Sequence, residues 1–232
     1  MFSDGMGFSA LLLSAMTLVP ALWTSQVHGD EVVFADDFDS GLSSKWKMAG
    51  VRADDYRIRD GGLELRVQPG TLTDKSPMVR VTIPYEEADV LIASVDITPL
   101  DPFSEQSEAA GIYLTADGRP EFGTRKQLID GHLVFSPAQP EFVGQAGEEG
   151  DSEKYVLRFW PATRESGPLR VILRNNVAYA QTGPSSQGKY RNLFHSALVK
   201  APERGFALVA TGGPVGKPHW VRFDNFRIIR SR

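Results

Sequence analysis

After residue 30 the chain consists mainly of short runs in which apolar and polar residues alternate. In GLELRV, Leu63, Leu65 and Val67 alternate with Glu64 and Arg66, which is the period-two pattern of a half-buried strand. MVRVTIP, further along the chain, repeats this pattern. Further strand candidates are DVLIASVDITPL, AAGIYLTAD, GHLVFSP, KYVLRFWPA, LRVILRNN, GFALVATGG and HWVRFDNFRII. These runs are short, rich in Val, Ile and Phe, and bounded by Gly or Pro, which favours strands over helices.

Helical patterns are weak in comparison. KYRNLFHSALVKAP places Phe194 and Leu198 one turn apart, so a short helix or a loop turn is the expectation for that segment. No internal repeat and no change of composition marks a second domain. Many short strands with one hydrophobic face each have to close on each other. The sequence therefore predicts an all-β fold, a two-sheet antiparallel β-sandwich, in a single domain over residues 30–232.

The N-terminal segment differs in kind from the rest. Residues 8–23 carry no charge, but the run is too short and too interrupted by Pro20 for a comfortable membrane span. Val27 and Gly29 are small residues of the kind that precede a signal-peptidase cut, so we expect a secretory signal peptide over residues 1–29. Because no Lys or Arg precedes the apolar run, a buried or anchoring N-terminal helix is the alternative.

Composition excludes several classes of function. The chain has 25 Lys and Arg against 29 Asp and Glu, and the expected signal peptide holds one of these acids and no base, so the mature net charge is about −3. This leaves no basic excess for nucleic acid or an anionic membrane, and neither is an expected partner. Cysteine is absent, which excludes disulfides, cysteine zinc sites and thiol chemistry.

Three segments carry a family resemblance. FADDFDSGLSSKWK has an aspartate–phenylalanine strand with a tryptophan after a short loop, YRIRDGGLELRV reads as a hairpin, and GFALVATGG is followed by HWVRFDNFRII. Over residues 33–230 they resemble the concanavalin A-like lectin/glucanase superfamily, with its laminin-G-like modules and 3-keto-disaccharide hydrolase-like domains; residues 100–195 carry none of these motifs. The resemblance implies a jelly roll whose concave sheet can hold sugar, in exported proteins that bind or process polysaccharides.

The first and last predicted strands both set aspartate between phenylalanines, and in such a sandwich these strands commonly lie side by side. Strict alternation in WVRFDNFRII would place Val221 and Phe223 on one face and Phe226 and Ile228 on the other, and a bulge at Asp224-Asn225 would turn all four inward. A carboxylate beside buried aromatic rings needs a partner. Calcium, which takes side-chain and backbone oxygens together, is the predicted structural cofactor, with Asp37 and Asp224 as its ligands. Alternatively these aspartates accept backbone N–H bonds or pair with neighbouring arginines.

One acidic motif resembles a catalytic one. In GEEGDSEKY, Glu149, Asp151 and Glu153 have the E-x-D-x-E order of retaining family 16 glycoside hydrolases, in which alternate strand residues place nucleophile and acid/base on one face. Here the motif lies in a glycine-rich acidic run and not in an apolar strand. We therefore predict no catalytic residues and keep this triplet for the alternative in which the protein is an enzyme. The histidines of the mature chain have no metal-ligand spacing.

Aromatic residues give the stronger signal, because sugar rings stack their apolar C–H faces on aromatic rings. The candidates are Tyr113, Trp160, Tyr179, Tyr190 and Trp220. Trp160 shares a strand face with Arg158, and Arg174 is near if LRVILRNN pairs as the next strand. We predict Trp160, Arg158 and Arg174 as carbohydrate-binding residues; the alternative is that Trp160 belongs to the core of the second sheet.

These patterns predict an exported carbohydrate-binding or accessory interaction module, secreted or held in the periplasm or cell envelope, with a polysaccharide or glycan as its partner. A glycoside hydrolase or related glycan-processing enzyme is the first alternative, and a structural envelope protein without a sugar site is the second. Two carboxylates about 5–5.5 Å apart in a groove would favour the hydrolase. An aromatic-lined groove without such a pair would favour binding.

Overall fold

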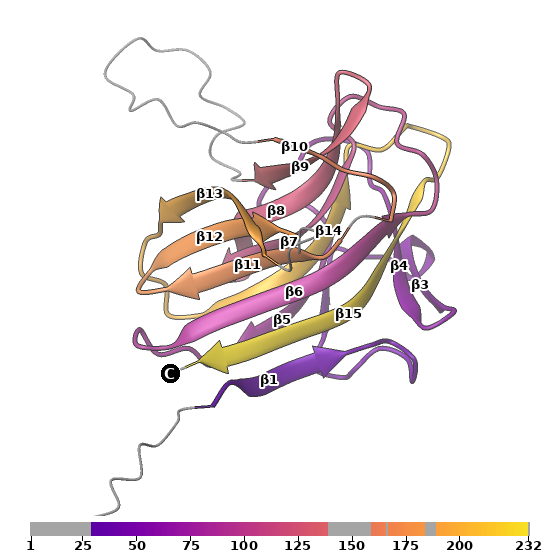
Figure 1. Cartoon of the computed structure of the whole chain (residues 1–232). Coiled ribbons are helices and arrows are strands. Elements are labelled where there is room, and N and C mark those ends of the chain that lie inside the picture. Colours follow the sequence, from indigo (N-terminus) through magenta and orange to yellow (C-terminus); the bar gives the residue numbers. More distant parts are fainter. Residues whose placement is uncertain (1–28, 139–158, 166, 184–188, 232) are drawn as a thin grey trace, which may run out of the picture.

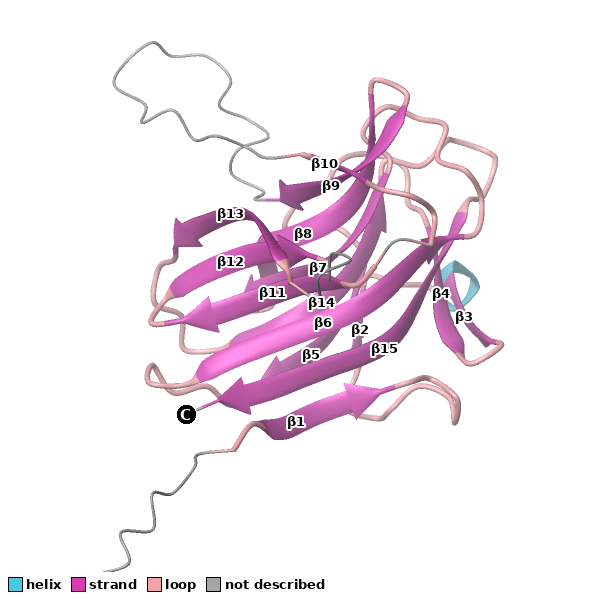
Figure 2. Ribbon diagram, in the orientation of Figure 1, coloured by secondary structure: helices cyan, strands magenta, loops and turns pink. Residues whose placement is uncertain are grey.

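The computed structural model describes residues 29–138, 159–165, 167–183 and 189–231, and strands dominate them (Figures 1 and 2). The strands are β1 (Glu31–Asp36), β2 (Lys47–Ala49), β3 (Tyr56–Arg59), β4 (Gly62–Arg66), β5 (Met78–Ile83), β6 (Val90–Pro99), β7 (Ala109–Ala116), β8 (Arg119–Ile129), β9 (His132–Ala138), β10 (Trp160–Pro161), β11 (Leu169–Arg174), β12 (Val177–Thr182), β13 (Arg191–Ala197), β14 (Arg204–Thr211) and β15 (Trp220–Ser231). The helical structure of the described residues is one 3₁₀ turn, η1 (Ala53–Asp55).

The strands form two antiparallel sheets that stack face to face. The eight-stranded sheet has the order β13-β12-β11-β6-β15-β4-β3, with β1 paired to β15, and the seven-stranded sheet has the order β10-β9-β8-β7-β14-β5-β2. In Figure 1 the eight-stranded sheet lies in front of the seven-stranded one. The predicted all-β sandwich is confirmed.

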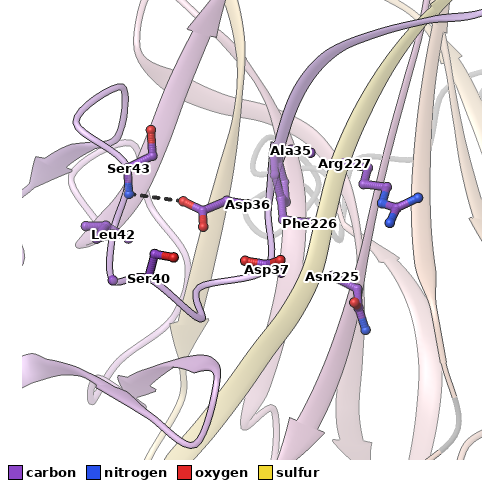
Figure 3. Close-up of a pocket in the computed structure, with 10 residues that line it drawn as sticks. Ala35, Asp36, Asp37, Ser40, Leu42, Ser43, Asn225, Phe226 and Arg227 are labelled. Atoms are coloured by element: carbon purple, nitrogen blue, oxygen red, sulfur yellow. Dashed lines mark hydrogen bonds between the residues drawn. The ribbon is translucent and has the colours of Figure 1, made fainter.

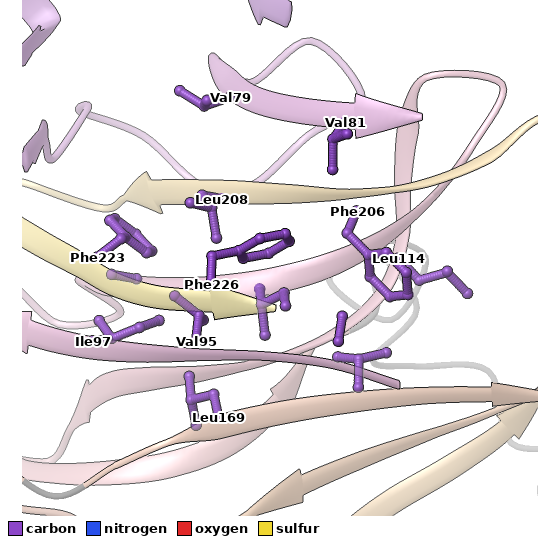
Figure 4. Packing of buried hydrophobic residues seen from close by; sticks show 14 of the residues in the cluster. Val79, Val81, Val95, Ile97, Leu114, Leu169, Phe206, Leu208, Phe223 and Phe226 are labelled. Carbon is purple, nitrogen blue, oxygen red and sulfur yellow. The ribbon is translucent and has the colours of Figure 1, made fainter. Parts of the chain in front are cut away.

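The core fills the space between the sheets. Every second residue of β6, from Leu91 to Ile97, is at most 1% exposed, so the period-two pattern of the sequence becomes an alternation of burial. Figure 4 shows Leu208 of β14 and Phe226 of β15 meeting between the two layers. Burying one such side chain contributes about 1.5–3 kcal/mol, which is why register in these strands is well determined.

The two outer faces differ. The residues of β14 are buried on both faces, because Val209 belongs to a second apolar cluster that also contains Leu72 and Tyr113. Along β6 and β11, by contrast, buried residues alternate with half-buried or exposed ones. The more open sheet surface is therefore the outer face of the eight-stranded sheet.

A bulge in β15 shapes that face. One side of β15 pairs with β6 along most of its length, while the other side pairs first with β4 and then with β1. The register with β6 shifts between Asp224 and Arg227, and Asn225 takes a φ of 52°, a left-handed conformation that Asn tolerates well. The predicted bulge and the pairing of the end strands are confirmed. Val221 and Phe223 before the bulge and Phe226 and Ile228 after it all point inward and are buried.

The segment around Phe194 is a strand, so the expectation of a helix or loop turn is wrong. Residues Arg191–Ala197 form β13, which adds to the edge of β12. The register shift opposite Ala180 and Gln181 turns Leu193 and Phe194 inward, where Phe194 stacks on Phe122 with 6.0 Å between ring centroids. Pairing with an open strand edge overrode a weak helical spacing.

Candidate functional site

Asp36 fastens the end of β1 to the loop that follows it. Its Oδ1 accepts the N–H of Phe38 at 2.9 Å, and its Oδ2 accepts the N–H of Ser43 at 3.1 Å and the indole Nε1–H of Trp46 at 2.8 Å. The Trp46 ring then packs edge-on against Phe226 of β15 at 4.8 Å between centroids. The carboxylate at the first strand therefore acts as an acceptor for three N–H groups.

Beside Asp36 lies the terminal pocket, an open hollow of about 270 Å³ between residues 35–43 and residues 225–227. Figure 3 shows Asp36 turned toward Ser43 and Asp37 lying on the side of Asn225. Asp37 is exposed, and its Oδ1 accepts the N–H of Asp39 at 3.3 Å. This is a local turn contact of the kind that the sequence left open as the alternative.

The predicted calcium ligands, Asp37 and Asp224, line different pockets. Asp224 Oδ1 accepts the N–H of Asn225 at 2.7 Å. Within the described residues there is no group of three or more His, Asp or Glu side chains placed to hold a metal ion, whereas calcium takes about six to eight oxygen ligands. Carboxylates alone therefore supply too few ligands at either aspartate, and calcium stays an untested prediction.

A larger hollow, the sheet pocket, opens on the outer face of the eight-stranded sheet with a volume of about 470 Å³. Its floor is residues 96–98 of β6 together with Arg222, Asp224 and Asn225 at the bulge, and residues 165, 167 and 168 form its wall. Asp96 and Asp224 lie directly opposite each other on neighbouring strands. The bulge also turns Asn225 outward, so that its Nδ2 donates to Asp96 Oδ2 at 2.9 Å.

The sheet pocket has an acidic character. Burial raises the pKa of Asp224 above its ordinary value, and the charges of Asp96 and Asp39 add to the rise, while the N–H of Asn225 and the charge of Arg222 oppose it. A partly desolvated carboxylate beside a second carboxylate accepts hydroxyl donors well and repels anions. The pocket therefore favours a neutral ligand that is rich in hydroxyl groups.

Among the described residues that line this pocket, one carries a guanidinium group, and this group is paired on the side away from the pocket. Arg222 Nη2 donates to the buried carboxylate of Glu64 at 2.8 Å, and Arg57 Nε donates to the same carboxylate at 2.5 Å. Arg57 in turn covers the ring of Trp220 at 4.0 Å. Glu64 thus neutralises much of the Arg222 charge, and this pairing explains how a polar position of a predicted half-exposed strand becomes buried.

Two rows of side chains cross five strands of the same outer face, next to the sheet pocket. The cross-strand register defines the Tyr179 row, which consists of Ile229, Ile92, Ile172, Tyr179 and His195. The parallel Arg170 row consists of Arg227, Ser94, Arg170, Gln181 and Asn192. All of these residues are half-buried or exposed. Neighbouring strands lie about 4.8 Å apart, so each row extends over about 19 Å.

Aromatic contacts hold parts of these rows in place. The rings of Tyr179 and His195 stack with 5.7 Å between centroids, and the Arg170 guanidinium lies over the ring of Tyr190 at 4.4 Å. A flat apolar strip beside a row of hydrogen-bonding groups has the chemistry that sugar rings require, because their C–H faces stack and their hydroxyl groups need polar partners.

The predicted binding residues are not brought together. Trp160 pairs with Phe135 in the seven-stranded sheet, packs against the core and carries the Arg191 guanidinium at 4.7 Å from its ring centroid. Arg174 is exposed at the end of β11, in the other sheet. The assumed pairing of their two strands is wrong, because β11 pairs with β6 and β12. Arg158 lies outside the described residues.

Other candidates fall into three groups. The acidic triplet Glu149, Asp151 and Glu153 lies outside the described residues. Tyr113 is a core residue, 1% exposed, and His219 is buried with its Nδ1 2.7 Å from Glu108 Oε1. Asp96, Asn225 and Arg170 were not among the predicted site residues. Asp96 carries a usable signal, because it is a carboxylate at a polar position within an otherwise apolar strand, DVLIASVDITPL.

Comparisons with known proteins agree on the fold. No protein-family model and no curated protein matches the sequence. Among solved structures, the GH43 protein BlXynB from Bacillus licheniformis is similar with a TM-score of 0.63 at 15% identity, over 84% of this chain and 39% of that one. The CBM2 module of the evolved Dit of Lactobacillus casei BL23 phage J-1 gives a TM-score of 0.54 at 13% identity, over 86% of this chain and 95% of that one.

A structure described with the endo-acting O-glycanases of the human gut microbiota gives a TM-score of 0.52 at 14% identity, over 86% of this chain and 99% of that one. This chain thus spans about two fifths of the GH43 protein and nearly all of the other two. At these identities the likeness shows the β-sandwich fold, which glycoside hydrolases and carbohydrate-binding modules share. In the part of the chain that is described, no helix has the length and hydropathy of a membrane span.

Proposed function

We propose that this domain is an exported carbohydrate-binding module of the concanavalin A-like lectin/glucanase type, which binds a neutral polysaccharide. The observation that carries the proposal is the juxtaposition of the Tyr179 row, the Arg170 row and the sheet pocket on one open sheet face. The apolar row would receive sugar faces, and the polar row and the pocket would bind hydroxyl groups. Glycoside hydrolases and a carbohydrate-binding module among the solved structures of this fold support the class.

The chemistry of the face narrows the ligand. Most contact groups project from strands, where the backbone fixes their spacing, so the face suits an extended ligand laid across several strands. Asp96, Asp224 and Glu165 line the sheet pocket, while Arg222 is paired with Glu64. Uronic acids and sulfated sugars would meet three carboxylates there. We infer a preference for neutral over anionic polysaccharides.

Hydrolysis is the second candidate, and one observation favours it. Asp96 and Asp224 face each other across neighbouring strands, and the pKa of Asp224 is raised by burial. A retaining mechanism uses a carboxyl pair: Asp224 would protonate the glycosidic oxygen while Asp96 attacks the anomeric carbon and the leaving sugar departs, and water, giving a proton to Asp224, would then release the bound sugar from Asp96. Binding stays first because Asp224 Oδ1 and Asp96 Oδ2 already accept hydrogen bonds from Asn225.

A polysaccharide panel tests the proposal. The exported protein is run by affinity electrophoresis through gels that contain neutral or anionic polysaccharides, and each mixture is assayed for new reducing ends. We expect retardation by at least one neutral polysaccharide, none by the anionic ones, and no new reducing ends. Reducing ends that the native protein produces and Asp224→Asn does not would show that the protein is a hydrolase and contradict the binding-module proposal. No retardation by any polysaccharide would contradict the carbohydrate function.

A further inference from the structure

Lys126 of β8 crosses the sandwich to reach the edge of the sheet pocket. Its side chain is 0% exposed, although lysine is among the residues least often buried. Its Nζ donates to the backbone oxygen of Ile97 at 2.6 Å and to that of Arg164 at 2.8 Å. Ile97 belongs to the pocket floor, and Arg164 belongs to the segment that leads into the pocket wall. One ammonium group therefore joins the two sheets and the wall.

The backbone oxygen of Ile97 is left to a side-chain donor because the neighbouring strand ends too early to pair with it. The β11 strand begins at Leu169, opposite Val95, so its ladder stops before it reaches Ile97. The preceding residues 162–165, which we call the wall segment, are tied to β9 by a backbone bond from Ala162 to Leu133 at 3.0 Å. Lys126 binds the middle of this segment from the inside, while the Arg164 guanidinium donates to Leu100 from the outside at 3.0 Å.

The charged groups that face Lys126 come from the pocket. Asp96 on β6 and Glu165 on the wall segment favour the ammonium form, while burial opposes it and lowers the pKa of Lys126 to about 8. From β9 the ring of Phe135 contributes a contact at 5.8 Å. The same ammonium group thus attracts one carboxylate on the floor of the sheet pocket and one on its wall.

We propose that Lys126 is a positioning residue of the sheet pocket: its buried ammonium group holds the wall segment against β6 and so sets the distance between Glu165 and Asp96. The effect on ligand binding rests on the proposed function, whereas the effect on the wall segment does not. Ammonium groups donate stronger hydrogen bonds to carbonyl oxygens than neutral amines do. Loss of the Lys126 proton therefore loosens the wall segment and lowers the affinity of the pocket.

The pH dependence separates this role from a general contribution to stability. Burial places the pKa of Lys126 at about 8 in the folded protein, below its ordinary value of 10.5. Between these two pH values the unfolded chain binds more protons, so the contribution of Lys126 to global stability rises with pH. Opening of the wall segment alone, in contrast, leaves Lys126 between the sheets without the Arg164 acceptor, so the closed wall segment holds the proton more tightly and weakens as the pH rises through about 8. Local and global stability should therefore change in opposite directions.

Hydrogen exchange of the exported protein tests the inference at about pH 6.5 and about pH 9.5, on either side of the Lys126 titration, after correction for the intrinsic exchange rate. Exchange rates are compared for the backbone amides of the wall segment and, as an internal reference, for those of residues 204–211 of β14. The variants are Lys126→Met, which keeps much of the apolar volume, and Lys217→Met, a control at an exposed lysine.

We expect the wall segment of the native protein and of Lys217→Met to exchange severalfold faster at the higher pH, with residues 204–211 unchanged or slower. In Lys126→Met the wall segment should exchange fast at both pH values, and affinity for a polysaccharide that binds the native protein should fall severalfold. A native wall segment whose exchange does not change with pH would overturn the inference, even if Lys126→Met fails to fold. If no polysaccharide binds, the proposed function fails, and the exchange data still decide the role of Lys126.

Discussion

The carboxylate of Asp36 accepts a 2.8 Å hydrogen bond from the indole Nε1 of Trp46. This bond places the Trp46 ring between Phe34 of the first strand, at 5.3 Å, and Phe226 of the last, at 4.8 Å. The two ends of the domain are therefore joined by one aromatic cluster in addition to the β1–β15 ladder. The aspartate among phenylalanines in the first strand is explained by this structural role.

Asp36→Ala should lower the free energy of unfolding by about 2–4 kcal/mol, because three N–H groups lose a charged acceptor and the indole N–H is left in a buried site. Urea denaturation followed by tryptophan fluorescence measures this. Asp37→Ala is the matched control, since Asp37 is exposed and makes one long local contact; its effect should stay within about 0.5 kcal/mol. Equal losses in the two variants would contradict the assignment.

The bulge gives a second prediction. Because Asn225 has a φ of 52°, a β-branched residue is strained there, and Asn225→Val should cost about 1–2 kcal/mol through the backbone alone. Asn225→Gly removes the same side-chain bond to Asp96 without that strain. Thermal unfolding of both variants separates the backbone strain from the loss of the side-chain bond. If Asn225→Val is as stable as Asn225→Gly, the backbone at residue 225 does not disfavour a β-branched residue.

The raised pKa of Asp224 gives a pH-dependent prediction. Since burial raises the pKa above 3.8 in the folded protein, the folded state binds more protons just above this pH, and the contribution of Asp224 to stability falls as the pH rises. Asp224→Asn keeps an acceptor for the N–H of Asn225 and removes the charge. Its melting temperature should exceed that of the native protein at pH 7, and the difference should shrink as the pH falls towards about 4. A variant that melts lower than the native protein at pH 7 would contradict a net destabilisation by the buried charge of Asp224.

Chelation tests the calcium prediction. Among the described residues no three His, Asp or Glu side chains are grouped to hold a metal ion, so we expect EDTA to leave the melting temperature of the protein unchanged. A fall on chelation that calcium reverses, and that Asp224→Ala abolishes, would show that Asp224 holds the ion after all. By mass action, a site at about 100 times its dissociation constant stabilises by about 2.7 kcal/mol, which is easily measured.

The parts of the fold that sequence predicted depend on local patterns. Alternation defined β4, β5 and β6, and the broken alternation in WVRFDNFRII located the bulge, because a strand that must bury both of its halves on one face has to add a residue. The helical spacing of Phe194 and Leu198 was also local, but it was too weak to compete with strand pairing.

The site depends on which strands are neighbours, and this is not a local property. Trp160 and Arg174 are close in sequence yet lie in different sheets, whereas Asp96 and Asp224 are distant in sequence and lie opposite each other. Tyr179 was one of several aromatic candidates, and what distinguishes it is its register with Ile172 and His195. Such rows become visible only when strand order and register are known.

Calorimetric titration with the neutral polysaccharide that retards the protein most is the most direct test of the central claim, with Tyr179→Ala and Trp160→Ala compared in parallel. Both variants remove one half-buried aromatic ring, but Tyr179 projects from the outer face of the eight-stranded sheet and Trp160 packs against the core. We predict that Tyr179→Ala weakens binding by about 1–3 kcal/mol, by analogy with other aromatic stacking platforms, and that Trp160→Ala lowers the melting temperature without changing the affinity of the folded protein. Full affinity in Tyr179→Ala together with a loss in Trp160→Ala would contradict the account and move the binding site to the edge of the seven-stranded sheet.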